Sequence, residues 1–242
     1  MLIDAHTHIR KEDIDNGILR IMEDADIYSL VAATNPEEAE YIKKLAASSP
    51  RIIPTYGLHP WYSHKHSLLD MRSYFEESPI IGEIGMDSTW CHVDLDCQRK
   101  IFIKQLEIAE ERGCPVMLHT KGQEREILGI INEFSMPVIV HWYSSMDYLE
   151  GFLIRGCYFT VGPDVRINPA VQQVVEKAPL ERLLVETDGL GAVEWALGKK
   201  VLPKDLPNIL QDSLDCIAEI KDIHRNQVQK EMEATFKRLI FK

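Results

Sequence analysis

Short apolar segments alternate with longer amphipathic ones along the whole chain. The short segments contain Val, Ile and Leu with little polar alternation, which is typical of strands buried on both faces of a parallel sheet. We predict eight such strands, at residues 2–8, 28–34, 52–60, 80–87, 115–120, 137–142, 158–162 and 183–188.

Amphipathic helical patterns separate the predicted strands. The clearest covers residues 96–112, with Phe102 and Leu106 on one face, and Gly113 directly after it is a typical helix stop. We predict further helices at residues 36–47, 124–133, 169–177, 206–221 and 225–239. This alternation predicts an α/β fold, a single-domain (β/α)8 TIM barrel over residues 1–242. A doubly wound open sheet is the alternative, but eight strands would be many for it.

Composition and charge narrow the range of functions. The chain carries 27 Lys and Arg against 38 Asp and Glu, a formal net charge of −11 at pH 7. Proteins that bind nucleic acid through sequence-independent phosphate contacts usually have a basic surface. The charge therefore excludes a globally basic protein. It is compatible with a small anionic substrate or with a nucleic-acid end held by bound cations.

Cysteine usage and hydropathy indicate the compartment. The five cysteines include no CxxC pair, which argues against a disulfide framework and a zinc ribbon. The N-terminal segment lacks the pattern of a signal peptide, and no apolar run approaches the roughly 18 residues of a membrane span. We therefore expect a cytoplasmic protein with no membrane association, and no obligate protein partner is evident.

Polar side chains gather at the ends of the predicted strands, where TIM-barrel active sites are built. They are His6, His8, Glu83, Asp87, His119, His141, Glu186 and Asp188. Strand residues two apart share a face, so Asp4, His6 and His8 are expected to point together. The same holds for the two acidic pairs on the fourth and eighth strands. If that face is the barrel interior, these side chains converge at one mouth.

Such a cluster is costly to bury unless its members are paired or bound to cations. Imidazole with carboxylate is the ligand mix for Zn, Mn, Fe and similar divalent ions. Two ions can be satisfied if one carboxylate bridges them, and Glu83 is the best placed to do so. Ions roughly 3.5–4 Å apart can clamp the attacking and leaving oxygens of a hydrolytic reaction. The pattern therefore predicts a metal centre for hydrolysis.

Three other residues near these strand ends carry weaker signals. Lys121 follows the fifth predicted strand and could contact a substrate anion, but its position favours an exposed loop lysine. Trp61 and Trp90 either line the mouth or cover the outside of the barrel, and the sequence does not distinguish the two.

Several motifs and their order resemble the TatD family of metal-dependent hydrolases. DAHTH lies at residues 4–8, GLHP at residues 57–60 and GEIGMD at residues 82–87, followed by PVMLHT, PVIVHWYSS and LLVETD. The resemblance extends from residue 2 to about residue 190. It implies a (β/α)8 barrel that hydrolyses phosphodiesters with two divalent cations (Zn, Mn, Mg, Ni or Fe), in several members as a deoxyribonuclease.

Carried over by position, the resemblance implies a role for each site residue. One ion would be held by His6, His8, Glu83 and Asp188, and the other by Glu83, His119 and His141. Glu83 would bridge the ions, and Glu83 and Asp188 would be catalytic, with Asp188 accepting a proton from the attacking water. His59, in GLHP, would contact a phosphate of the substrate.

The chain departs from the family pattern around the expected substrate. GLGAVEWALG follows the strand-eight ETD where the family has a proline-containing segment, and Thr120-Lys121 replaces the family's Ser-Arg. The expected substrate is thus a phosphoester, with single-stranded DNA ends, including 3′ ends, as one candidate. A small-molecule amidohydrolase or phosphoesterase is the first alternative, although many of these bridge their metals with a carboxylated lysine where this chain has Glu83. A metal-holding accessory protein without catalysis is the second, and retention of Asp188 argues against it.

Overall fold

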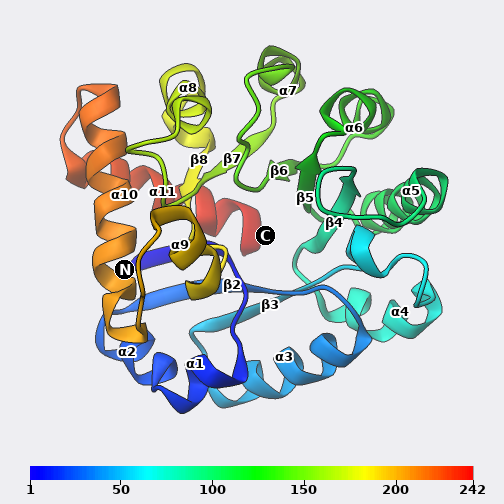
Figure 1. Ribbon diagram of the computed structural model, residues 1–242, viewed down its shortest axis with the longest axis horizontal. Helices are drawn as coiled ribbons and strands as arrows, with labels where there is room; N and C mark the ends of the chain where they lie inside the picture. Colours follow the sequence, from blue (N-terminus) through cyan, green and yellow to red (C-terminus); the bar gives the residue numbers. More distant parts are fainter. Residues whose placement is uncertain (242) are drawn as a thin grey trace.

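Eight parallel strands form the centre of the computed structural model, which describes residues 1–241. Each strand pairs with the next along the chain, from β1 to β8, and Figure 1 looks into the resulting barrel. The strands are β1 (Leu2–Thr7), β2 (Ile27–Ala33), β3 (Ile52–Tyr56), β4 (Ile81–Asp87), β5 (Val116–Lys121), β6 (Val138–Val140), β7 (Tyr158–Val161) and β8 (Leu183–Val185). The predicted (β/α)8 fold is confirmed.

Helices surround the barrel. They are α1 (Lys11–Asp15), α2 (Ile18–Asp24), α3 (Pro36–Ser48), α4 (Leu68–Glu77), α5 (Leu95–Arg112), α6 (Glu124–Ile131), α7 (Leu149–Arg155), α8 (Pro169–Lys177), α9 (Leu190–Leu197), α10 (Leu206–Lys221) and α11 (Arg225–Ile240), with 3₁₀ helices η1 (Pro60–Tyr62), η2 (Leu180–Arg182) and η3 (Pro203–Asp205). The six predicted helices are present, with ends that differ by two residues or fewer. The sequence pattern does not predict the shorter helices α1, α2, α4, α7 and α9.

Three predicted strands end at least two residues earlier in the structure. β3, β6 and β8 end at Tyr56, Val140 and Val185, so the site residues expected at their ends lie in the loops that follow. The backbone leaves the extended conformation there, with φ of 35° at Trp142 and 57° at Asp188. These loops turn the chain across the barrel mouth, the end at which the carboxyl termini of the strands lie.

The ends of β1 and β8 are joined by a small hydrogen-bonded cluster. Asp4 accepts hydrogen bonds from the Thr187 amide at 2.9 Å and from its hydroxyl at 2.6 Å, and the Asp188 amide donates to the His6 carbonyl at 3.0 Å. Asp4 therefore directs both carboxylate oxygens to Thr187. Gly189 has φ 86°, and a Cβ there would lie 2.6 Å from the His8 carbonyl oxygen. The cluster places Asp188 beside the β1 histidines.

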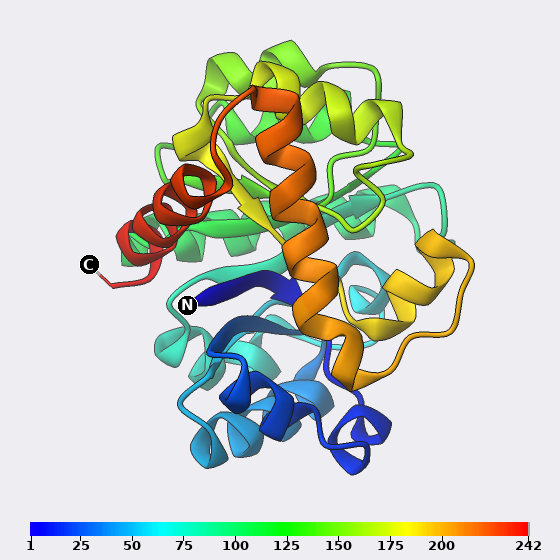
Figure 2. The ribbon, with the colours of Figure 1, turned by 90° about the vertical axis from the view of Figure 1, so that its left-hand side faces the viewer.

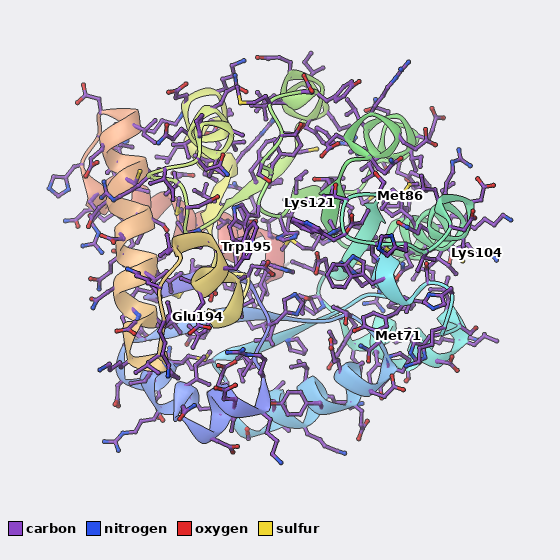
Figure 3. The ribbon with its side chains drawn as sticks, viewed as in Figure 1. Met71, Met86, Lys104, Lys121, Glu194 and Trp195 are labelled. Carbon is purple, nitrogen blue, oxygen red and sulfur yellow. The ribbon has the colours of Figure 1, made fainter. Side chains whose placement is uncertain are left out.

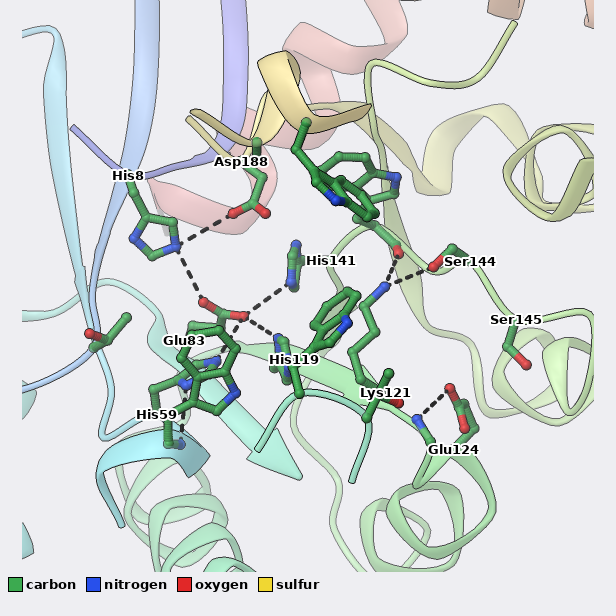
Figure 4. A pocket seen from close by; sticks show the side chains of 18 of the residues that line it. His8, His59, Glu83, His119, Lys121, Glu124, His141, Ser144, Ser145 and Asp188 are labelled. Carbon is green, nitrogen blue, oxygen red and sulfur yellow. Dashed lines mark hydrogen bonds and ion pairs between the residues drawn. The ribbon is translucent and has the colours of Figure 1, made fainter. Parts of the chain in front are cut away.

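The two ends of the barrel differ in what covers them. In Figure 2, α9 (gold) lies at the mouth and α11 (red) lies at the opposite end. There the amino group of Met1 lies 3.1 Å from Glu233 Oε1, and Gln229 Nε2 donates to the Met1 carbonyl. Within residues 1–241, no helix is long and apolar enough to cross a membrane. The histidines and carboxylates that the sequence predicts as metal ligands lie at the opposite end, at the mouth (Figure 4).

Candidate metal centre

Glu83, from β4, lies at the centre of the mouth (Figure 4). Its Oε1 atom lies 2.7 Å from His119 Nδ1 and 3.0 Å from His141 Nε2. Its Oε2 atom lies 3.5 Å from His6 Nε2 and 3.4 Å from His8 Nε2. The two oxygens of one buried carboxylate thus face two different pairs of imidazoles.

Asp188 completes the group around the β1 histidines. Its Oδ1 atom lies 3.4 Å from His6 Nε2 and 3.5 Å from His8 Nε2. Three sets of donor atoms in the described residues are close enough to hold an ion: His6 with Glu83 and His141, His6 with His8 and Asp188, and His59 with Glu83 and His119. The structure therefore brings together all six residues that the sequence predicts as ligands.

Two of the histidines are oriented by a second partner. His8 Nδ1 lies 3.2 Å from the Ala32 carbonyl oxygen, and His119 Nε2 lies 3.1 Å from Asp87 Oδ2. Because these partners accept hydrogen bonds, each of those nitrogens carries the proton and the other ring nitrogen faces Glu83. Such partners fix the orientation of metal-ligating histidines.

The Asp87 carboxylate accepts several hydrogen bonds that the sequence does not predict. Its Oδ2 atom also accepts a hydrogen bond from Trp61 Nε1 at 2.7 Å, and its Oδ1 atom accepts from the amides of Thr89 and Trp90. Burial raises the pKa of Asp87, but His119 and the other donors lower it well below its usual range. Asp87 is thus an ionised carboxylate that positions His119. The sequence signal for it is its place in GEIGMD.

His59 differs from the other histidines in the nitrogen it presents. Its Nδ1 atom accepts a hydrogen bond from the Trp61 amide at 3.3 Å, while its Nε2 atom lies 3.5 Å from Glu83 Oε1. Burial lowers the pKa of His59 to about 4, so the ring is neutral with its proton on Nε2. His59 therefore directs an N–H group, rather than an unprotonated nitrogen, toward Glu83.

The electrostatics of the centre favour bound cations. Burial raises the pKa of Asp188, but His6, His141 and His8 lower it to about 2. Burial also raises the pKa of Glu83, and the neighbouring histidines lower it well below its usual range. In the described part of the chain, the ring nitrogens of His6 and His141 are buried without a partner in hydrogen-bonding geometry. Buried carboxylates beside unsatisfied imidazole nitrogens are a donor set that fits divalent cations.

A cavity of about 890 Å³ opens above Glu83. Trp61, Trp90, Trp142 and Trp195 all line it, and so does Lys121. The expectation of an exposed loop lysine is wrong, because Lys121 ends β5 and is half-buried. Its Nζ atom donates a hydrogen bond to Ser144 Oγ at 2.7 Å, and the strand directs it into the cavity. The sequence marks the segment that contains Trp195 as a departure from the family pattern, but no local pattern places the Trp195 ring in this cavity.

A TIM barrel with imidazoles and carboxylates at its mouth is an architecture of metal-dependent hydrolases. Residues 3–241 match the family described as TatD related DNase. The chain belongs to this family. The resemblance seen in the motifs is confirmed, and with it the expected class of enzyme, a hydrolase acting on ester bonds.

Individual relatives cover most of the chain. The deoxyribonuclease TATDN3 of Homo sapiens is 24% identical across 94% of this chain and 90% of that protein. The 3′-5′ ssDNA/RNA exonuclease TatD of Escherichia fergusonii is 26% identical across 75% of this chain and 76% of that protein. The crystal structure of YjjV, a TatD homologue from Escherichia coli, superposes with a TM-score of 0.85 at 22% identity, covering 99% of this chain and 97% of that chain. The superposition shows the shared fold.

Proposed function

We propose that this chain is a phosphodiesterase that depends on two divalent cations and whose substrates include the 3′ ends of single-stranded DNA. The observation that carries the proposal is the division of the Glu83 carboxylate between two pairs of imidazoles. A carboxylate in this position can bridge two ions. The family membership and the names of the nuclease relatives support the phosphoester as the substrate.

The ligand sets follow from the contacts of Glu83. The side chains proposed for one ion are His6, His8, Glu83 and Asp188, and those for the other are Glu83, His119 and His141. The ions are of the kind that imidazole and carboxylate accept, namely Zn²⁺, Mn²⁺, Mg²⁺, Ni²⁺ or Fe²⁺. His59 stays outside both sets because its Nδ1 atom is occupied by the Trp61 amide.

The residues around the proposed ions have separate tasks in hydrolysis. Divalent cations supply Lewis acidity and bring the pKa of an attacking water to near 7. Asp188, ionised and partly open to the cavity, would hold one ion and would accept the proton that the attacking water loses. His59 donates its Nε2 proton in a hydrogen bond to a phosphate oxygen. Asp87 keeps His119 oriented through the 3.1 Å contact.

The test is turnover after removal and replacement of the metal. Protein stripped with EDTA is supplied with each of the five cations and assayed on bis(p-nitrophenyl) phosphate and on single-stranded DNA and RNA labelled at either end. We expect hydrolysis only with added cation. DNA labelled at its 3′ end should release mononucleotide at once, whereas DNA labelled at its 5′ end should shorten stepwise.

Two histidine variants make the assay specific to the site. His141→Asn removes a proposed ligand and should abolish turnover. His224→Asn alters an exposed histidine at the start of α11 and should leave turnover unchanged. Hydrolysis of amide or lactone substrates without any phosphoester activity would replace the proposal with a small-molecule amidohydrolase. Tight metal binding without turnover of any substrate would favour an accessory role.

A further inference from the structure

Helix α9 begins two residues after Asp188 and lies at the cavity. Leu190 and Val193 anchor it in the core, whereas Trp195 is 71% exposed. Figure 3, which looks into the mouth, labels Trp195 near the centre of the barrel. The segment that departs from the family pattern thus places an indole ring at the entrance to the proposed metal centre.

The ring of Trp195 packs against two other tryptophan rings and remains largely open to solvent. Its centroid lies 6.1 Å from that of Trp90, with an interplanar angle of 82°, and 6.2 Å from that of Trp142, with an angle of 73°. Such edge-to-face contacts stabilise the position of a ring, and most of the Trp195 side chain remains exposed to solvent. Exposed apolar surface beside a cavity is typical of a ligand-binding site.

The charges of the cavity limit what can bind there. Among the described residues that line it, Lys121 is the one lysine or arginine, whereas Glu38, Glu124 and Asp164 add negative charge. The Lys121 ammonium lies 5.3 Å from the centroid of the Trp90 ring. Sites that follow a long single strand need a positively charged groove along its backbone. This cavity instead offers one cation next to an aromatic surface.

We propose that Trp195 is a specificity-determining residue that stacks on the nucleobase beside the scissile bond, while Lys121 binds one neighbouring phosphate. The site would then contact only the terminal nucleotides, so that a dinucleotide is bound as tightly as a long single strand. This inference rests on the proposed function, phosphoester hydrolysis. The cavity of about 890 Å³ lies within the roughly 300–1,000 Å³ range of small-molecule sites.

Base stacking on an aromatic side chain gives the size of the expected effect. Trp195→Ala should weaken dinucleotide binding about fivefold or more, since stacking contributes at least about 1 kcal/mol per base. Trp195→Phe keeps an aromatic face and should retain most of the affinity. Ile154→Ala, at an exposed position on α7 away from the cavity, is the matched control and should change nothing.

The probes are a thymidine dinucleotide, the same dinucleotide with one abasic position, and a long thymidine oligomer. KM and kcat are measured with Mn²⁺-loaded enzyme, and Kd is measured by calorimetry in an Asp188→Asn background that turns over slowly. We expect Trp195→Ala to raise KM for the dinucleotide with little change in kcat. The variant should also lose the preference for the intact dinucleotide over the abasic one.

Salt dependence measures the number of phosphate contacts. For the oligomer, the single Lys121 contact contributes a slope of about −0.7 to the fall of log K with log salt. A slope steeper than about −2 for the oligomer, or an oligomer bound much more tightly than the dinucleotide, would overturn the proposal.

The inference and the proposed function fail in different ways. Normal hydrolysis with a Trp195→Ala variant that discriminates like the wild type would overturn the role of Trp195 alone. Binding of the dinucleotide that depends on Trp195, without hydrolysis in any metal, would support the stacking role and refute the phosphodiesterase.

Discussion

The cavity has two walls that are held in different ways. The metal wall, formed by His6, His8, Glu83, His119, His141 and Asp188, consists mostly of buried side chains, and two of its histidines contact a second carboxylate or carbonyl. The aromatic wall, formed by Trp90, Trp195 and Lys121, is more open, with Trp90 49% and Trp195 71% exposed. The metal wall is thus largely shielded from solvent, whereas the aromatic wall is open to a ligand. Substitutions in the metal wall should therefore affect rate, and those in the aromatic wall should affect binding.

The largest expected effect comes from Glu83→Ala, because both proposed ligand sets share this carboxylate. Turnover should fall by more than about 10⁴-fold, beyond the loss expected for a single general base. Circular dichroism should show a folded protein, since the barrel interior is filled by Val, Ile and Leu. Glu133→Ala, which removes an exposed carboxylate that does not line the cavity, is the matched control. A folded Glu83→Ala protein with near-normal turnover would refute the bridging role.

Asp188→Asn should have the next largest effect. The amide keeps the shape and one oxygen but cannot accept a proton from water, so kcat should fall about 10²–10⁴-fold. At least the ion of the His119 and His141 set should remain bound, which metal analysis of the dialysed variant checks. A loss below about tenfold with the metals in place would make Asp188 a replaceable ligand and not the proton acceptor.

Asp87→Asn should have a smaller effect because Asp87 acts through His119. Loss of such a partner weakens metal affinity or activity by about 10–100-fold. We expect the affinity for the ion of the His119 set to fall while KM at saturating metal stays close to the wild-type value. Unchanged metal affinity would mean that Asp87 does not position His119 for metal binding and that its contacts with Trp61, Thr89 and Trp90 only stabilise the fold.

The smallest effect concerns the pH dependence of metal binding. Burial and the charge of His6 lower the pKa of His141, but Glu83 and Glu186 raise it to about 9. An ion must displace the proton that His141 carries at pH 7. Apparent affinity should therefore rise about tenfold per pH unit for that proton and level off above about pH 9. Calorimetry in two buffers of different ionisation enthalpy measures the released proton, and its absence at pH 7 would contradict the assignment.

The sequence predicts the barrel because its strands are buried on both faces and its long helices are amphipathic. β4 is buried along its whole length, and α5 and α10 bury one face each. Helix α9 has no such signal, because LGAVEWAL is apolar almost throughout. The hydrophobic pattern also does not predict the early ends of β6 and β8. The course of the loops at the mouth depends on closure of the barrel and not on the local sequence.

Sequence pattern predicts the metal wall for a similar reason, but it predicts the aromatic wall only in part. His6, His8 and Glu83 lie in or next to strands, so their spacing alone brings them to the mouth. The pairing of Asp87 with His119 needs the register of two neighbouring strands, in which Asp87 lies opposite Lys121. Trp195 reaches Trp90 from a segment about a hundred residues away, and no local pattern carries that contact.

The most direct test of the central claim is electron paramagnetic resonance of the protein after equilibrium dialysis against Mn²⁺. If Glu83 bridges two ions, metal analysis gives about two Mn²⁺ per chain, and the spectrum shows an exchange-coupled pair at the roughly 3.5–4 Å separation of two-metal sites. Glu83→Ala should abolish the coupling. A wild-type protein that binds no Mn²⁺, or that shows only the six-line signal of isolated ions, would contradict the account.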